Sequence, residues 1–181
     1  MLTQHFRCEV VGIRLTFTAI NGFRNGESMS FEVTVDGRDK LVVDDSSANR
    51  LGGGSQGEVF VVTYHNKKYA LKWYTSPYIK KNRAFRENLR RNTMKEAPDC
   101  CFVWPQHFAE NNKSFGYLMD IIDTNRFTLF SNLYTGKKRI KDPKTGKKIT
   151  VDVGFDSVEP QITAAINLAN AFRSLHMAWF L

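Results

Sequence analysis

The stretch that decides the fold is LGGGSQGEVFVVTYHNKKYALKWY, residues 51 to 74. It contains two runs rich in β-branched and aromatic residues, GEVFVVTY and YALKWY, and such runs are typical of strands. The polar residues 65 to 68 between them predict a hairpin turn. We therefore expect a three-stranded antiparallel start, in which the glycine-rich residues join the first strand to the second.

Gly52, Gly54 and Gly57 form the pattern G-x-G-x-x-G, which by itself is a weak signal with three interpretations. A Walker phosphate loop needs Lys and then Ser or Thr directly after the last glycine, but Glu58 and Val59 stand there. A dinucleotide-binding fold needs a helix after the glycines and an acidic residue about twenty positions on. The following run is strand-like, and the residue twenty positions after Gly52 is a lysine, so both interpretations are disfavoured.

The third interpretation needs a strand after the loop, a Val two residues past the last glycine and Ala-x-Lys on the next strand. Val59, Ala70 and Lys72 satisfy all three conditions. LGGGSQGEV thus resembles the phosphate-covering loop of protein kinases, and YALK resembles their ATP-lysine strand. The resemblance implies that the loop glycines let the backbone approach a triphosphate and that Lys72 contacts its α- and β-phosphates. It also implies an apolar adenine slot formed by Leu51, Val59 and Ala70. Gln56 departs from the family, which commonly has an aromatic residue at this loop tip.

In kinases a glutamate on the next helix holds this lysine in position. Glu87, in RAFRENLRR, is our candidate for this role because Phe85 and Leu89 mark a buried helix face nearby, and Glu96 is the alternative. A second interpretation is a surface pair between Arg83 and Glu87 at i,i+4 spacing, which would contribute only a few tenths of a kcal/mol.

The stretch GYLMDIID resembles the fifth kinase strand and the hinge that follows it. Carried over residue by residue, Met119 is the gatekeeper, Asp120 is the first hinge residue and Ile122 supplies the hinge amide donor. Judged by itself, the stretch is equally compatible with an ordinary buried strand.

The last residues, LANAFRSLHMAWFL, resemble the helix that precedes the kinase catalytic loop, with Leu175 and His176 as the Leu-His pair. We expect His176 to be a packed structural histidine rather than a base. In the family, the catalytic Asp, the Mg-binding Asn and the Asp-Phe-Gly metal ligand follow this helix, and the sequence ends at Leu181 before any of them. We therefore expect the 181-residue chain alone to be inactive, without metal ligands of its own, and Mg²⁺ to act only in a complete enzyme of the Ser/Thr-like class.

The predicted fold class is α+β, in three parts. Residues 1–44 are a β extension with a turn at Asp36-Gly37. Residues 45–123 are a kinase-like ATP-binding lobe, with a five-stranded antiparallel sheet and one helix between about residues 79 and 95. Residues 124–181 contain an insertion with a surface hairpin turning at Thr145-Gly146, and then a long helix after Pro160 that begins a helical lobe.

The net charge of +8 is concentrated in two segments, residues 78–95 and 137–148. Each has seven basic residues and one acidic residue, so each carries +6 and the remaining chain carries −4. Solvated surfaces are the expected explanation, although such segments also attract nucleic acid, acidic protein surfaces or phosphorylated partners. The sequence has no nucleic-acid-binding motif, so we do not expect a nucleic-acid partner.

The sequence has no apolar run of roughly 18 to 20 residues, so no membrane span is expected. Its three cysteines, Cys8, Cys100 and Cys101, lack zinc-binding spacing and predict buried free thiols in the cytoplasm. Two further functions stay open: a non-catalytic pseudokinase module that binds nucleotide or a partner, and a basic nucleic-acid-binding protein.

Overall fold

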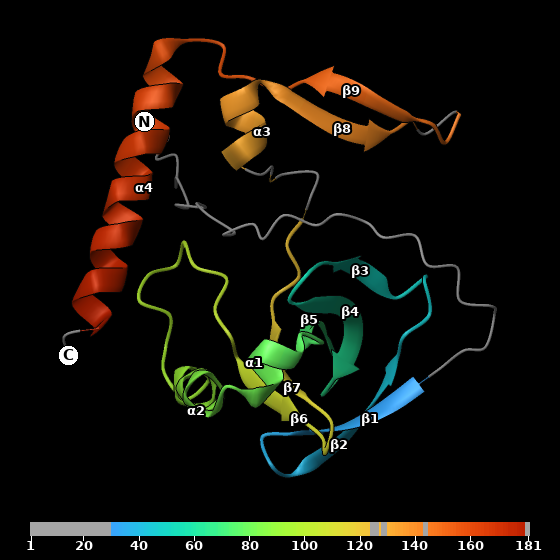
Figure 1. The fold of residues 1–181 in the computed structure, drawn as a ribbon. Helices are drawn as coiled ribbons and strands as arrows, with labels where there is room; N and C mark the ends of the chain where they lie inside the picture. Colours follow the sequence, from blue (N-terminus) through green and yellow to red (C-terminus); the bar gives the residue numbers. More distant parts are fainter. Residues whose placement is uncertain (1–29, 124–126, 128–129, 143–144, 180–181) are drawn as a thin grey trace. The chain divides into compact units, whose positions relative to one another are not determined.

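The computed structural model describes residues 30–123, 127, 130–142 and 145–179. These residues divide into two compact units, which are treated separately. The sheet unit comprises residues 30–97 and 103–121, and the helix unit comprises residues 98–102 and the described residues from 122 onward. The α+β class is confirmed: the chain combines a curled antiparallel sheet with a long C-terminal helix (Figure 1). The strands predicted before residue 30 lie outside the described residues.

The described residues of the sheet unit form one seven-stranded antiparallel sheet in the order β2-β1-β6-β7-β5-β4-β3. Its strands are β1 (Ser30–Val35), β2 (Asp39–Asp44), β3 (Arg50–Gly53), β4 (Gly57–Tyr64), β5 (Lys67–Tyr74), β6 (His107–Glu110) and β7 (Phe115–Met119). The predicted turn between β4 and β5 is confirmed, because His65 and Asn66 both have positive φ angles, of 47° and 62°. Two such residues make the type I′ turn whose twist matches that of paired strands.

The sheet is larger than the five strands expected, because β1 and β2 from the predicted extension join it. β1 pairs with β6 at Thr34↔Glu110 and Val35↔Ala109. The turn after β1 continues this contact: the N–H of Asp36 donates to the Phe108 carbonyl (2.8 Å), and one Asp36 carboxylate oxygen accepts from the Phe108 N–H (2.9 Å). Strands β1 and β2 of the predicted extension are therefore an integral edge of the sheet.

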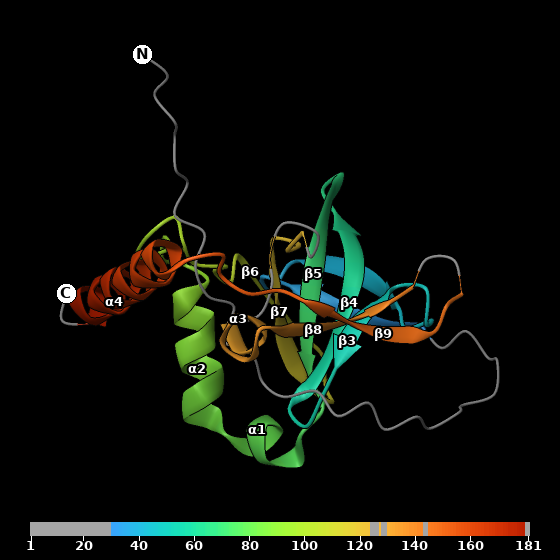
Figure 2. The ribbon, with the colours of Figure 1, turned by 90° about the horizontal axis from the view of Figure 1, so that it is seen from above.

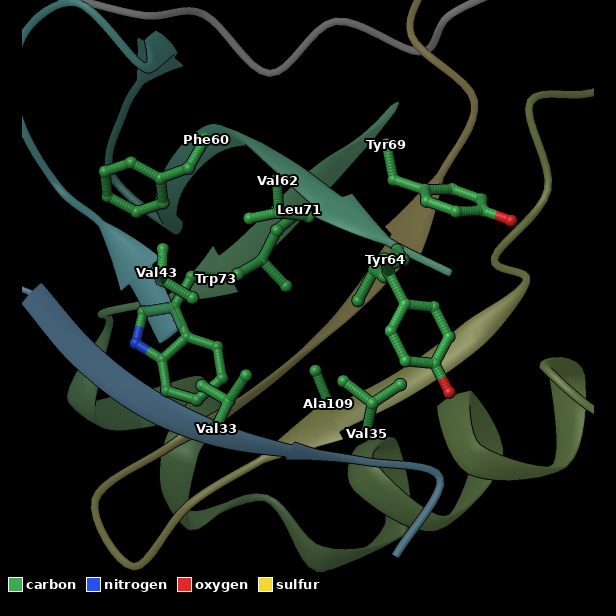
Figure 3. Close-up of a cluster of buried hydrophobic side chains, with 11 residues drawn as sticks. Val33, Val35, Val43, Phe60, Val62, Tyr64, Tyr69, Leu71, Trp73 and Ala109 are labelled. Atoms are coloured by element: carbon green, nitrogen blue, oxygen red, sulfur yellow. The ribbon is translucent and has the colours of Figure 1, made fainter. Parts of the chain in front are cut away.

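One face of the curled sheet encloses the main apolar core (Figure 3). Alternate residues of β4 and β5 point into it, as the two-residue period of a strand requires. Phe60, Leu71 and Leu118 lie side by side on three neighbouring strands and are at most 2% exposed. Phe31 packs against this core with its ring centroid 5.2 Å from that of Trp73.

The other face is partly covered by two helices, α1 (Pro77–Lys81) and α2 (Arg83–Asn92), which Figure 2 shows on one side of the sheet. A single helix over this segment was expected. Asn82 interrupts it, since its backbone is extended (φ −82°, ψ 94°) and its side chain caps α2 by accepting from the Phe85 N–H (3.0 Å). Leu89 of α2 packs with Tyr74, Phe108 and Phe115 in a second apolar cluster.

The helix unit contains α3 (Phe130–Thr135), a two-stranded sheet of β8 (Lys137–Lys141) and β9 (Lys148–Asp152), and α4 (Val158–Trp179). The predicted hairpin and the predicted long helix are both present, and Gly146 has the positive φ angle (68°) of a turn residue. Ala171 of α4 is buried, and Ser174 Oγ donates to Asp99 Oδ2 at 3.4 Å. His176 is exposed, so the expectation of a packed histidine is wrong.

No helix among the described residues is both long enough and apolar enough to cross a membrane. Of the two described cysteines, Cys101 is buried as expected, whereas Cys100 is exposed. Cys8 lies outside the described residues.

Candidate functional site

The glycine-rich segment forms the tip of the β3–β4 hairpin. The N–H of Gly54 donates to the Gly57 carbonyl at 2.8 Å, and the N–H of Gly57 donates back to the Gly54 carbonyl at 3.2 Å. A strand, not a helix, follows the last glycine. Walker loops and dinucleotide-binding loops both lead into a helix, so the structure disfavours both interpretations, as the sequence does.

Gly57 and Gly52 are explained by different features of the structure. A Cβ atom on Gly57 would lie 2.0 Å from the carbonyl oxygen of Trp73, so close packing against β5 requires glycine there whatever the function. A Cβ atom on Gly52 would meet nothing within 4 Å. Packing does not explain Gly52, and the open space beside it is where a ligand could approach the backbone.

The strand registers bring most of the predicted site residues onto one sheet face. Gly52 pairs with Val59, Val59 with Lys72, and Lys72 with Tyr117, so these four residues form a row across β3, β4, β5 and β7. Partners in an antiparallel ladder project to the same side of a sheet. The strand register therefore places Lys72 beside the glycine hairpin.

A second row on the same face lies two residues along the strands. Ala70 pairs with Val61 on one side and with Met119 on the other. Ala70 is buried, whereas Val61 and Met119 are partly exposed. We call the two rows together the site face, which comprises Gly52, Val59, Val61, Ala70, Lys72, Tyr117 and Met119.

Leu51 is the predicted adenine-slot residue that the ladder does not place on this face. It lies at an irregularity of the β3–β4 register between Arg50 and Gly52, and it is 51% exposed. Its role in the slot therefore stays a prediction.

Lys72 is an unusual residue for the middle of a sheet, because only 6% of it is exposed. Burial lowers the pKa of its ammonium group from the ordinary value of 10.5, because desolvation penalises the charged form. An anion bound beside Lys72 would offset this cost. A buried titratable group with a shifted pKa is also a frequent mark of a functional site.

Tyr117 was not predicted as a site residue, although the sequence carried a signal for it. It lies two residues before Met119 in β7, so strand alternation places it on the same face. Burial raises the pKa of its phenol. Its ring centroid is 6.3 Å from that of Tyr74, and both rings help fill the layer beneath α2.

The position of α2 is set by ion pairs that sequence reasoning did not find. Arg86 and Arg90 both reach Glu110 at the end of β6, and the Arg90 Nη2 atom lies 2.9 and 3.1 Å from the two carboxylate oxygens. The Arg90 guanidinium also lies 4.7 Å from the centroid of the Phe108 ring. These residues flank Leu89, so the sheet-facing side of α2 is basic and apolar.

Glu87 is the only carboxylate of α2, and its side chain is exposed. It lies two positions before Leu89, on a side of the helix turned away from that buried residue. The pair between Glu87 and Lys72 stays a prediction.

The predicted hinge follows β7. Asp120 lies just beyond the strand, and its carboxylate pairs with the Lys67 ammonium at 2.9 Å, which raises the pKa of Lys67. Ile122 is 38% exposed, and its N–H has no acceptor among the described residues. The boundary between the two compact units falls between residues 121 and 122, inside the predicted hinge.

Within the described ranges, no group of three or more His, Cys, Asp or Glu residues could hold a metal ion. Comparisons of the chain with models of protein families, with curated proteins and with solved structures find no match.

Proposed function

We propose that this chain is the ATP-binding portion of a protein kinase-like protein, which in its complete form transfers phosphate to Ser or Thr residues of proteins. The observation that carries the proposal is the site face, where the open side of Gly52, the buried Lys72 and the apolar Ala70 and Met119 share one side of the sheet. A triphosphate needs a close backbone approach and a fixed positive charge, and an adenine ring needs an apolar slot.

Different residues of the site face would contact different parts of ATP. The open backbone at Gly52 would approach phosphate oxygens, and Lys72 would neutralise part of their charge in a desolvated setting where that attraction is strong. Val59, Ala70 and Met119 offer apolar surface for the base. ATP is the ligand that combines these demands, and the predicted cytoplasmic location would supply it.

A non-catalytic pseudokinase-type module is the second candidate, and one observation favours it. Kinases hold the lysine with a helix glutamate, whereas Glu87 is exposed and the sheet-facing side of α2 carries Arg86 and Arg90. A protein that only binds nucleotide or a partner would not need this glutamate.

Calorimetric titration of the chain with ATP tests the proposal. We expect Lys72→Ala to weaken binding by about tenfold or more, because it removes a desolvated charge opposite a phosphate. Lys68→Ala is the matched control, since Lys68 is an exposed lysine on the same strand and should bind as the wild type does. If Lys72→Ala and Lys68→Ala bind ATP equally well, the site face is not a nucleotide site.

Glu87→Gln separates the two candidates. Weaker ATP binding in this variant would mean that Glu87 reaches Lys72 when nucleotide is bound, as a catalytic kinase requires. Unchanged binding favours the non-catalytic module.

A further inference from the structure

The β8–β9 hairpin concentrates positive charge on one side of a two-stranded sheet. Its register pairs Lys137 with Asp152, Arg139 with Thr150, and Lys141 with Lys148. Alternate residues share a face, so these six positions lie on one side, and Lys138, Ile140, Ile149 and Val151 lie on the other. We call the first side the basic face.

The basic face has too few carboxylates to neutralise its own basic residues. Asp152 is its only acid, at one end of the face. Like charges that are close together on one face repel one another, and a two-stranded hairpin is only marginally stable in water. Among the described residues, neither Arg139 nor Lys148 has an ion-pair partner, and both are exposed. The hairpin is therefore built with charge that a partner could neutralise.

Two backbone hydrogen bonds show which residues face the free edge of β8. The Asp142 N–H donates to the Lys147 carbonyl, and the Val153 N–H donates to the Gly136 carbonyl, both at 2.8 Å. Hydrogen-bonded pairs alternate along an antiparallel ladder, so residues 138 and 140 pair inward with β9. Residues 137, 139 and 141 consequently direct their N–H and C=O groups outward.

The same three positions thus carry the basic residues and the outward backbone groups. Thr135 Oγ1 lies 3.4 Å from the Lys137 carbonyl, which leaves the edge from Arg139 onward open to another strand within the described residues. A strand added there would place every second side chain opposite the basic face, about 6.8 Å apart along the strand.

We propose that the outer edge of β8 binds an extended segment of a protein partner that has acidic residues at alternate positions. The segment's backbone would pair with residues 139 and 141, and its carboxylates would lie opposite the basic face. This proposal does not depend on nucleotide binding at the site face.

A peptide fits this surface better than a nucleic acid does. Single-stranded nucleic acid is held by aromatic stacking as well as by charge, and the basic face contains only Lys, Arg, Thr and Asp. A peptide also supplies N–H and C=O groups in the spacing of the free edge, which a phosphate backbone lacks.

Fluorescence anisotropy with two labelled hexapeptides of equal composition, ETETET and EEETTT, tests the register on the full 181-residue chain. We expect ETETET to bind about fivefold more tightly or better, because only alternation puts all its carboxylates over the basic face. N-methylation of its glutamates should abolish binding, whereas N-methylation of its threonines should not. Equal binding of both peptides, or no effect of N-methylation on the glutamates, would overturn the proposal.

Variants of the chain test the surface. Arg139→Glu should weaken ETETET binding by about tenfold, whereas Lys113→Glu, an equal charge change in the β6–β7 turn, should have no effect. Lys148→Glu reverses one charge of the basic face, so we expect weaker peptide binding without a lower Tm, a combination that loss of folding would not produce. Equal effects of Arg139→Glu and Lys113→Glu on ETETET affinity would refute the assignment of the basic face as the binding surface. Tighter binding of tetrathymidylate, which carries the same three negative charges as ETETET, would refute the peptide preference.

Discussion

Leu71 and Lys72 are neighbours on β5, almost equally buried, and face opposite sides of the sheet. Leu71 is 0% exposed between Phe60 and Leu118, so its partners on both neighbouring strands are apolar. Lys72 is 6% exposed in the parallel row, where burial opposes its charge. The two rows share strands, turns and hydrogen bonds, so the backbone does not explain the lysine. The Leu71 row stabilises the fold, and under the proposed function the Lys72 row would give up stability for ligand binding.

The largest expected effect is on the core row. Leu71→Ala should lower the free energy of unfolding by about 2–5 kcal/mol, because it removes buried methyl groups and leaves a cavity. Urea titration monitored by tryptophan fluorescence measures this change. ATP affinity of the folded protein should stay the same, since Leu71 points away from the site face. A loss of less than about 1 kcal/mol would mean that the core row is not well packed.

The two ends of the glycine hairpin sharpen the comparison. Gly57→Ala should lower the free energy of unfolding by about 1–3 kcal/mol, because its Cβ would collide with the Trp73 carbonyl. Gly52→Ala should change stability by less than about 0.5 kcal/mol and still weaken ATP binding, because its Cβ occupies only the open space beside the site face. Thermal unfolding and ATP titration of both variants measure these effects. Equal destabilisation by the two substitutions would contradict the conclusion that packing requires glycine at position 57 and not at position 52.

The smallest effect is on the pH dependence of ATP binding. The pKa of Lys72 lies below 10.5 in the free protein, and a bound phosphate would raise it, so binding takes up a proton as pH increases through the free-state pKa. ATP affinity should therefore be highest below this pKa and should fall by at most about tenfold per pH unit above it. Titrations from pH 7 upward should show the decline in the wild type and in Lys68→Ala. The same decline in Lys72→Met would assign it to another group.

Local chemistry made much of the sheet predictable. Positions 65 and 66 accept the positive φ angles of a tight hairpin turn, and the alternating runs on either side specify β4 and β5. The same reasoning located β7 and the β8–β9 hairpin. Most of the site face follows from it, because Val59, Ala70, Lys72 and Met119 obey strand alternation once the strands are paired.

The sequence pattern could not predict the long-range contacts. The pairing of β1 with β6 joins segments more than seventy residues apart, and Asp36 completes it through contacts with His107 and Phe108. The interruption of the helix at Asn82 depends on a single capping residue. The basic side of α2 is turned toward the sheet by Glu110, a residue of a later strand, and no helical periodicity reveals such a partner.

The sequence by itself determined the glycine hairpin, the lysine two positions after Ala70 and the α+β class, since these depend on turn chemistry and on the two-residue period of strands. Tertiary structure alone decided that Lys72 is buried, that Glu87 is exposed and that the extension completes the sheet. Burial and register depend on which distant strands pack together, and hydrophobic and hydrogen-bonding forces fix that choice only when the whole unit folds.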